Sequence, residues 1–169
     1  MAQPKLIVFD LDYTLWPCWC DTHVTAPFKA NGDKTLLTDR YGEQIGFYRD
    51  VPEILAHIRD SEHYSAVSAS RTHAPEVAQE MLTKLHINKE PSKKYLDHML
   101  WGIGTKISHF KQIQKLTGVD FKDMVFFDDE SRNKDVEKAL GVTFVLVRNG
   151  VTWDMFKKGI EMWRTKNGH

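Results

Sequence analysis

Short apolar runs alternate with segments of helical periodicity along most of the 169-residue chain. Four runs have the length and composition of buried strands, and they cover residues 6–9, 64–69, 124–127 and 143–147. Apolar residues recur every three to four positions in the segments that predict amphipathic helices, 51–58, 74–85, 105–116, 131–140 and 152–163. This alternation predicts an α/β fold, a doubly wound parallel sheet with helices on both faces and right-handed crossovers.

Capping residues mark the ends of several predicted helices. Asp50 and Thr105 are placed to be N-caps, Pro52 lies in a first turn, and Gly118 follows a last turn as a C-cap. The helix after Thr105 is expected to bury an apolar face made of Ile107, Phe110, Ile113 and Leu116. Residues 95–101 fit either a short strand or a helical turn, and both interpretations stay open.

The segment from about residue 17 to 48 has weak periodicity and many turn-forming residues. Residues 35–38 and 44–48 could be the arms of a small hairpin. The segment is too short and too polar to bury a core of its own, so we expect a flap over the site. The chain as a whole, 1–169, is thus predicted to be a single domain with a full-sized core.

Polar residues directly follow three of the predicted strands. Asp10 ends the first strand, Ser70 follows the second, Asp128 follows the third, and Asp12 comes two residues after Asp10. Strand ends of a parallel sheet lie along one edge, where open α/β sheets bind ligands, so these residues should converge. Buried acids are costly unless a cation or a reaction needs them, which favours a functional site. The alternative is that Asp10 and Asp12 are solvated turn residues or a helix cap.

The chemistry of this residue set indicates phosphoryl transfer. Three converging carboxyl groups suit Mg²⁺, which prefers oxygen ligands and shares them with a substrate phosphate. One carboxylate can attack phosphorus, and a second can protonate the leaving oxygen and later activate water. A hydroxyl and a lysine would hold the remaining phosphoryl oxygens, and the chain offers Ser70 and Lys106 for these tasks.

Composition argues against several other classes of function. Lys plus Arg and Asp plus Glu both number 23, so the zero net charge does not suggest binding to nucleic acid or to an anionic membrane. No apolar run approaches the roughly 20 residues that span a bilayer, and no signal-peptide apolar region follows Met1. Cys18 and Cys20 lie too close in sequence to join distant elements, so we expect free thiols and a cytoplasmic protein.

Four stretches carry a resemblance to a known superfamily. The motifs of the haloacid dehalogenase (HAD) superfamily are matched by Asp10-Leu11-Asp12-Tyr13-Thr14, by Ser70, by Lys106 at a helix start, and by Asp128-Asp129 after an apolar strand. More narrowly, FDLDYTLWP (9–17), ASRT (69–72) and FFDDESRN (126–133) resemble the eukaryotic magnesium-dependent phosphatases. The likeness spans nearly the whole chain, and members of that family are capless, which agrees with a short flap.

This resemblance implies a role for each acidic residue. Asp10 would be the nucleophile and Asp12 the general acid and base. Mg²⁺ would be held by Asp10, the backbone carbonyl of Asp12 and Asp128, with Asp129 supporting the metal from nearby. The implied activity is hydrolysis of phosphate monoesters through an aspartyl phosphate, on phosphotyrosine, including phosphotyrosine peptides, or on sugar or glycated-sugar phosphates.

The resemblance also gives Ser70 and Lys106 the task of binding phosphate. Lys93, Lys94 and Lys111 are rivals to Lys106, but none of them lies at a helix start that a glycine precedes, and solvated lysines are the rule. Ser70 alone is a weak signal, because its assignment depends on its position at a strand end.

Several neighbouring residues allow two interpretations. Arg71 fits a clamp on the distal part of the substrate and, equally, a partner for a helix carboxylate. Asn133 is expected to orient Asp129 by a hydrogen bond in preference to facing solvent. Trp16 and Trp19 fit a pocket wall or a cover for the sheet edge. Histidine suits softer metals, so surface positions are expected for His23, His73 and His109.

Three functions compete at this point. The first is a Mg²⁺-dependent phosphatase acting on a small phosphorylated substrate or peptide. The second is a phosphoacceptor signalling domain of the receiver type, and the third is a non-catalytic binding module on the same fold. Asp12 favours turnover over storage of a phosphoryl group, and an intact catalytic set argues against the binding module. The oligomeric state is open.

Overall fold

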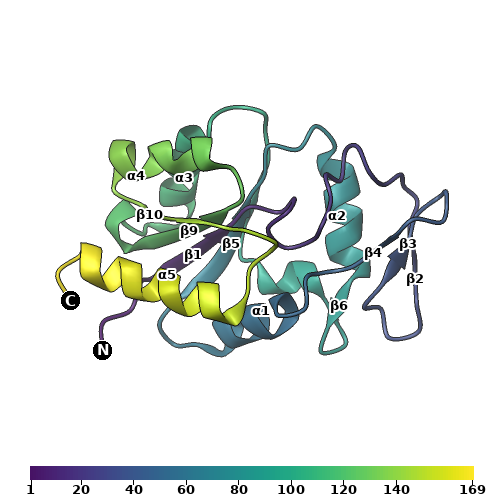
Figure 1. Ribbon diagram of the computed structural model, residues 1–169, viewed down its shortest axis with the longest axis horizontal. Coiled ribbons are helices and arrows are strands. Elements are labelled where there is room, and N and C mark those ends of the chain that lie inside the picture. The colour runs from purple at the N-terminus through teal and green to yellow at the C-terminus, as the bar shows by residue number, and fades with distance from the viewer.

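The computed structural model describes residues 1–169, and a five-stranded parallel sheet forms its centre (Figure 1). Across the sheet, the strands are β10 (Thr143–Leu146), β9 (Met124–Asp128), β1 (Leu6–Phe9), β5 (Ser65–Ala69) and β8 (Met99–Leu100). The four apolar runs predicted as strands are β1, β5, β9 and β10. The fifth, β8, pairs with β5 and shows that residues 95–101 contain a strand. The predicted α/β fold is confirmed.

Helices cover both faces of this sheet (Figure 1). One face packs against α1 (Val51–Asp60), α2 (Pro75–Lys84) and α5 (Trp153–Lys166), and the other against α3 (Lys106–Thr117) and α4 (Asp135–Leu140). Neighbouring residues of β1 point to opposite faces, as the period of two in a strand requires. Ile7 and Phe9 belong to the larger core cluster, whereas Leu6 and Val8 belong to the smaller one. Both faces of the central strand are therefore fully buried.

The ends of α3 are as predicted, but its buried face is rotated. The Thr105 side chain accepts a hydrogen bond from the backbone N–H of Ser108, and Gly118 ends the helix in the left-handed conformation with φ of 70°. Leu116, expected in the core, is 54% exposed, and His109, expected at the surface, is 1% exposed. The reason is that α3 turns Lys106 inward, and His109, one turn later, follows it into the interior.

Asp50 occupies the N-cap position of α1, but its side chain makes no capping bond to that helix. The carboxylate instead accepts a hydrogen bond of 3.0 Å from the backbone N–H of Trp153, the first residue of α5. Thr152 caps α5 through the N–H of Met155. Asp50 therefore ties together the starts of two helices that share one face of the sheet.

The segment expected to be a flap forms a small antiparallel sheet of β2 (Lys29–Ala30), β3 (Leu37–Thr38) and β4 (Gln44–Ile45). It lies at the far end of the molecule beside α2 (Figure 1). Phe28, just ahead of β2, donates its N–H to Glu80 at 2.6 Å and accepts from Lys84 at 2.6 Å, and both partners belong to α2. The next hairpin is formed by β6 (His86–Ile87) and β7 (Glu90–Pro91). The N–H of His86 donates a hydrogen bond to the carbonyl of Lys34, which lies between β2 and β3. The expected hairpin is present, but it is anchored on α2.

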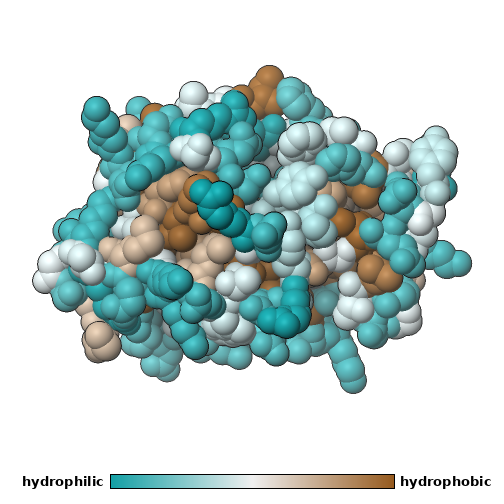
Figure 2. Space-filling model, in the orientation of Figure 1, coloured by the Kyte–Doolittle hydropathy of each residue, from teal (hydrophilic) through white to brown (hydrophobic).

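The opposite end of the sheet is the edge strand β10. Figure 2 shows a mostly hydrophilic face with its largest hydrophobic area over β10 and α5. The Glu137 side chain accepts from the backbone N–H of Phe144, and Lys166 donates to the carbonyl of Val142, so side chains occupy part of this edge. No helix combines the length and the apolar character that a membrane crossing requires.

Candidate active site

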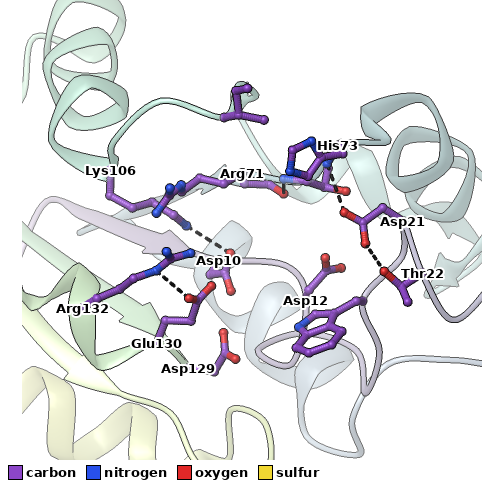
Figure 3. Close-up of a pocket in the computed structure, with 14 residues that line it drawn as sticks. Asp10, Asp12, Asp21, Thr22, Arg71, His73, Lys106, Asp129, Glu130 and Arg132 are labelled. Atoms are coloured by element: carbon purple, nitrogen blue, oxygen red, sulfur yellow. Dashed lines mark hydrogen bonds and ion pairs between the residues drawn. The ribbon is translucent and has the colours of Figure 1, made fainter.

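A cavity of about 600 Å³ opens at the carboxyl ends of β1, β5 and β9. Its walls come from five short stretches of chain, and their side chains point into a common space (Figure 3). The lining residues are Asp10, Asp12, Trp19, Asp21, Thr22, Ser70, Arg71, Thr72, His73, Ile103, Lys106, Asp129, Glu130 and Arg132. The predicted convergence of strand-end residues is therefore observed.

Three carboxylates form an acidic cluster at the base of this cavity. Oxygen atoms of Asp10, Asp128 and Asp129 all lie within 4.8 Å of one another. Burial raises the pKa of Asp10 well above its usual range, against the opposing effect of Lys106, and the charge of Asp128 raises it further. Burial likewise raises the pKa of Asp129 to about 6. Burial and repulsion between neighbouring carboxylates thus both oppose full ionisation of the cluster.

Lys106 supplies the only ammonium group inside this cluster. Its Nζ lies 3.1 Å from Asp10 Oδ1, 3.1 Å from Asp128 Oδ2, and donates to the carbonyl of Ala69 at 2.7 Å. Burial lowers the pKa of Lys106, but the two carboxylates outweigh that effect and raise it above its ordinary value. The rival lysines at positions 93, 94 and 111 are exposed. Of the four candidates, Lys106 alone reaches the strand ends.

Asp128 is completely buried, and both of its carboxylate oxygens accept hydrogen bonds. Its Oδ1 accepts from the backbone N–H of Glu130 at 2.9 Å, and its Oδ2 accepts from Asn133 Nδ2 at 2.8 Å. Asn133 was expected to orient Asp129, and that expectation is wrong. The short 3₁₀ helix Ser131–Lys134 turns the amide back towards the strand end, where Asp128 is the carboxylate within reach.

Asp12 stands apart from the acidic cluster and has its own set of donors. Its Oδ1 accepts from Trp16 Nε1 at 2.8 Å and from the backbone N–H of Cys20 at 3.2 Å, while Oδ2 accepts from Cys20 Sγ at 3.8 Å. Tyr13 adopts a left-handed conformation with φ of 58°, which turns the chain so that Trp16 faces Asp12. Burial raises the pKa of Asp12, against the effect of these hydrogen bonds.

Cys18 and Cys20 are free thiols, as predicted, and both are buried. Burial first, and the nearby charge of Asp12 second, raise the pKa of both thiols above the ordinary value. Both sulfurs therefore keep their protons at neutral pH, and the thiol of Cys20 is a hydrogen-bond donor and not a nucleophile.

Ser70 and Arg71 follow β5 into the cavity. Ser70 is 2% exposed and its hydroxyl accepts from the backbone N–H of Thr72 at 3.2 Å. Arg71 makes no ion pair, so the interpretation as a partner of a helix carboxylate does not apply. Its Nε is buried without a hydrogen-bond partner, which is unusual, while the residue lines the cavity.

The two tryptophans take different places. Trp16 is fully buried and stacks on Phe47, whereas Trp19 is 51% exposed and lines the cavity. Of the residues expected in the flap, only Trp19, Asp21 and Thr22 line the cavity, and residues 24–69 contribute nothing to it. Ile103 and Arg132 also line the cavity, although neither was predicted to do so. Ile103 lies in a glycine-rich turn just before Lys106, and Arg132 lies inside the FFDDESRN motif. Their closeness to motif residues was the signal in the sequence that could have identified them.

The donor set fits a hard divalent cation. Asp10, Asp128 and Asp129 present only carboxylate oxygens, and no thiol or imidazole shares the cluster. Mg²⁺ prefers such ligands and leaves positions for water and substrate phosphate. The carboxylate of Asp12 is not part of this cluster and keeps its own donors. The residues present therefore agree with a magnesium site at the strand ends.

Comparisons with known proteins agree with this geometry. The acid phosphatase family profile matches residues 2–166. A HAD-like hydrolase superfamily protein of Schizosaccharomyces pombe is 47% identical over 147 residues, which covers 84% of each chain. Human magnesium-dependent phosphatase 1 is 43% identical over 159 residues, covering 94% of this chain and 86% of the human protein.

A solved structure shows the same fold at greater evolutionary distance. A HAD family enzyme of Bacteroides thetaiotaomicron, solved as a magnesium complex, superposes with a TM-score of 0.61 at 17% identity, covering 93% of this chain and all of that one. The fold is thus that of the HAD hydrolases. The chain belongs to the acid phosphatase family of this superfamily, and it is a magnesium-dependent phosphatase that hydrolyses phosphoric monoesters.

Proposed function

We propose that this phosphatase works in two steps through a phosphorylated Asp10. The observation that supports this most is the division of the acids into two groups. Asp10 lies in the cluster with Asp128, Asp129 and Lys106, whereas Asp12 lines the same cavity with separate donors. The cluster suits binding and attack on phosphorus, and the separate carboxylate suits proton transfer.

In the first step, a carboxylate oxygen of Asp10 bonds to phosphorus while the bond to the leaving oxygen breaks. Asp12 gives its proton to that oxygen, so the leaving group departs as an alcohol. In the second step, Asp12 takes a proton from water, the water oxygen bonds to phosphorus, and the bond to Asp10 breaks. Inorganic phosphate leaves and Asp12 is protonated again.

The other residues hold the phosphoryl group during both steps. Lys106, at the start of α3, and the Ser70 hydroxyl, directly after β5, would donate to its oxygens. Asp10, Asp128, Asp129 and the Asp12 carbonyl would hold Mg²⁺, which when bound supplies positive charge against the phosphoryl oxygens. Asn133 and the N–H of Glu130 fix the orientation of Asp128.

The residues at the cavity mouth favour a substrate whose leaving group is flat or partly apolar. Trp19 and Ile103 are the apolar residues of the lining, and they are 51% and 63% exposed. Such surfaces suit the ring of phosphotyrosine or the carbon face of a sugar or glycated-sugar phosphate. The guanidinium group of Arg71, which lines the cavity, would bind an oxygen on the distal part of the same substrate. Two buried free thiols are consistent with work in the cytoplasm.

Rapid mixing with 4-nitrophenyl phosphate and Mg²⁺ tests the two-step mechanism. In Asp12→Asn, loss of the base should make the second step limiting, so we expect a burst of nitrophenolate near one equivalent of enzyme, followed by slow turnover. Steady-state rates of phosphate release are then measured with phosphotyrosine peptides and, separately, with glucose 6-phosphate. The two rates show which substrate class the enzyme prefers. A linear nitrophenolate trace with wild-type turnover would contradict the role of Asp12.

A further inference from the structure

The carboxylate of Asp12 is connected to the next strand end by a line of hydrogen bonds that the mechanism above does not use. Cys20 Sγ lies 3.8 Å from Asp12 Oδ2 and 3.3 Å from Thr72 Oγ1. Thr72 in turn donates its backbone N–H to Ser70 Oγ at 3.2 Å. The line therefore runs from the acid that follows β1 to the hydroxyl that follows β5.

Proton positions in this line can be assigned from its partners. Thr72 Oγ1 already accepts from the backbone N–H of Ala74 at 3.1 Å, so its hydrogen is free to point at Cys20 Sγ. The thiol hydrogen of Cys20 is then free for Asp12 Oδ2. Each group donates to the next, in the order Thr72, Cys20, Asp12.

Cys20 contacts both oxygens of the Asp12 carboxylate, and the two contacts differ in strength. Its backbone N–H, together with the Trp16 indole, holds Oδ1, while Oδ2 receives only the thiol. A thiol is a weak donor, so it orients an oxygen without tying up its lone pairs. This arrangement fixes the plane of the carboxylate and leaves Oδ2 as the oxygen that exchanges a proton.

We infer that Cys20 is a positioning residue for the reaction, which orients the Asp12 carboxylate for proton transfer to the leaving oxygen. The inference rests on the proposed role of Asp12 as general acid. Cys20 is fully buried and does not line the cavity, so it does not reach the substrate and its effect has to pass through Asp12. Thr72, which is 7% exposed, holds the Cys20 thiol through its hydroxyl group.

The leaving group distinguishes positioning from a merely structural role. A nitrophenolate departs without a proton, whereas the alkoxide of glucose 6-phosphate needs one. In Cys20→Ala, kcat/KM for glucose 6-phosphate should fall about ten-fold, because misdirected acid catalysis loses part of its effect. The value for 4-nitrophenyl phosphate should stay near that of the wild type. Cys20→Ser keeps a donor and should recover part of the loss.

Cys18 provides a matched control. It is 3% exposed, lies two residues away, and makes no side-chain hydrogen bond to Asp12. Cys18→Ala should change kcat/KM for glucose 6-phosphate and for 4-nitrophenyl phosphate by the same factor. Equal losses on both esters in Cys20→Ala, no loss at all, or the same selective loss in Cys18→Ala would each overturn the inference.

Asp12→Asn separates this inference from the proposed mechanism. Selective loss on glucose 6-phosphate in Asp12→Asn, without it in folded Cys20→Ala, refutes the role of Cys20 alone. If Asp12→Asn impairs both esters equally, the general acid is misassigned and both statements fail. Thr72→Val combined with Cys20→Ala gives a second test, because a shared line requires the selective losses to be less than additive. Fully additive losses would show that Thr72 does not act on Asp12 through the Cys20 thiol.

Discussion

The carboxyl edge of the five-stranded sheet and the small sheet β2–β3–β4 are positioned by different forces. At the edge, Asp10 and Asp128 continue two neighbouring buried strands whose residues pair in register from Leu6 to Phe9. In the small sheet, each strand has two residues, and its place depends on a few side-chain bonds to α2 and on single buried residues such as Leu37. The first region is set by the backbone of the core, and the second by individual contacts. We therefore expect chemistry to be sensitive to changes at the edge, and stability to changes in the small sheet.

The largest expected effect is at the sheet edge. Asp10→Asn removes the nucleophile and should lower phosphate release by about 10⁴-fold or more, as loss of a nucleophile does in other covalent enzymes. The ion pair between Lys106 and Asp128 at 3.1 Å remains, so thermal unfolding should still show one cooperative transition. A folded Asp10→Asn protein that releases phosphate at the wild-type rate would refute the assignment.

A core substitution in the small sheet should lower stability and leave activity unchanged, the opposite of Asp10→Asn. Leu37 in β3 is fully buried and joins the larger core cluster. Leu37→Ala should lower the free energy of unfolding by about 2–5 kcal/mol, the range for truncating a buried leucine. Because residues 24–69 do not line the cavity, kcat/KM at saturating Mg²⁺ should stay near the wild-type value.

Urea unfolding and steady-state kinetics measure the two sides of this prediction. Leu116→Ala is the control, since that side chain is 54% exposed and its loss should change stability by less than about 0.5 kcal/mol. A selective change in substrate preference in Leu37→Ala would show that the small sheet reaches the site after all.

Sequence reasoning succeeded where backbone periodicity decides the outcome. The strands before Asp10 and Asp128 follow from apolar runs, and the convergence of their ends follows from the geometry of parallel sheets. It failed where single side chains decide. Nothing in the sequence says that Asn133 reaches Asp128 in preference to Asp129, because that depends on one turn of 3₁₀ helix.

The same limit explains the errors in α3 and in the flap. Periodicity predicted an apolar face for α3, but the carboxylates of Asp10 and Asp128 draw Lys106 inward and rotate His109 into the interior with it. The hairpin was recognised from its turn residues, but its position depends on bonds between Phe28 and two side chains of α2, more than 50 residues away. Sequence patterns do not encode such long-range pairs.

A smaller effect is expected from the residue that orients Asp128. Asn133→Ala removes the 2.8 Å hydrogen bond to Oδ2 and should raise the Mg²⁺ concentration for half-maximal activity by about 10-fold, at the lower end for partners of metal ligands. A magnesium titration of phosphate release measures this shift. Asn31→Ala is the counterpart in the flap, where Asn31 only holds the turn before β3 through Thr35 and Leu36. A matching shift in both variants would remove the distinction between the two regions.

The smallest expected effect tests the boundary inside the predicted flap. Trp19 lines the cavity with half of its surface exposed, and its ring stacks on His23 at 5.3 Å. If it holds the ring of an aryl leaving group, Trp19→Ala should raise KM for a phosphotyrosine peptide several-fold, since an aromatic contact is worth about 0.5–1.5 kcal/mol. The value of kcat should change little, because Trp19 makes no contact with Asp10, Asp12 or Lys106 through a hydrogen bond.

Tyr41 is the matched aromatic on the other side of that boundary. It belongs to the turn between β3 and β4, is 76% exposed and does not line the cavity. Tyr41→Ala should therefore leave KM for the same peptide unchanged. If both variants raise KM equally, the peptide contacts the whole segment from 17 to 48, and the small sheet takes part in substrate binding. If only Trp19→Ala does, substrate recognition ends before β2, and the rest of the segment serves to hold α2 in place.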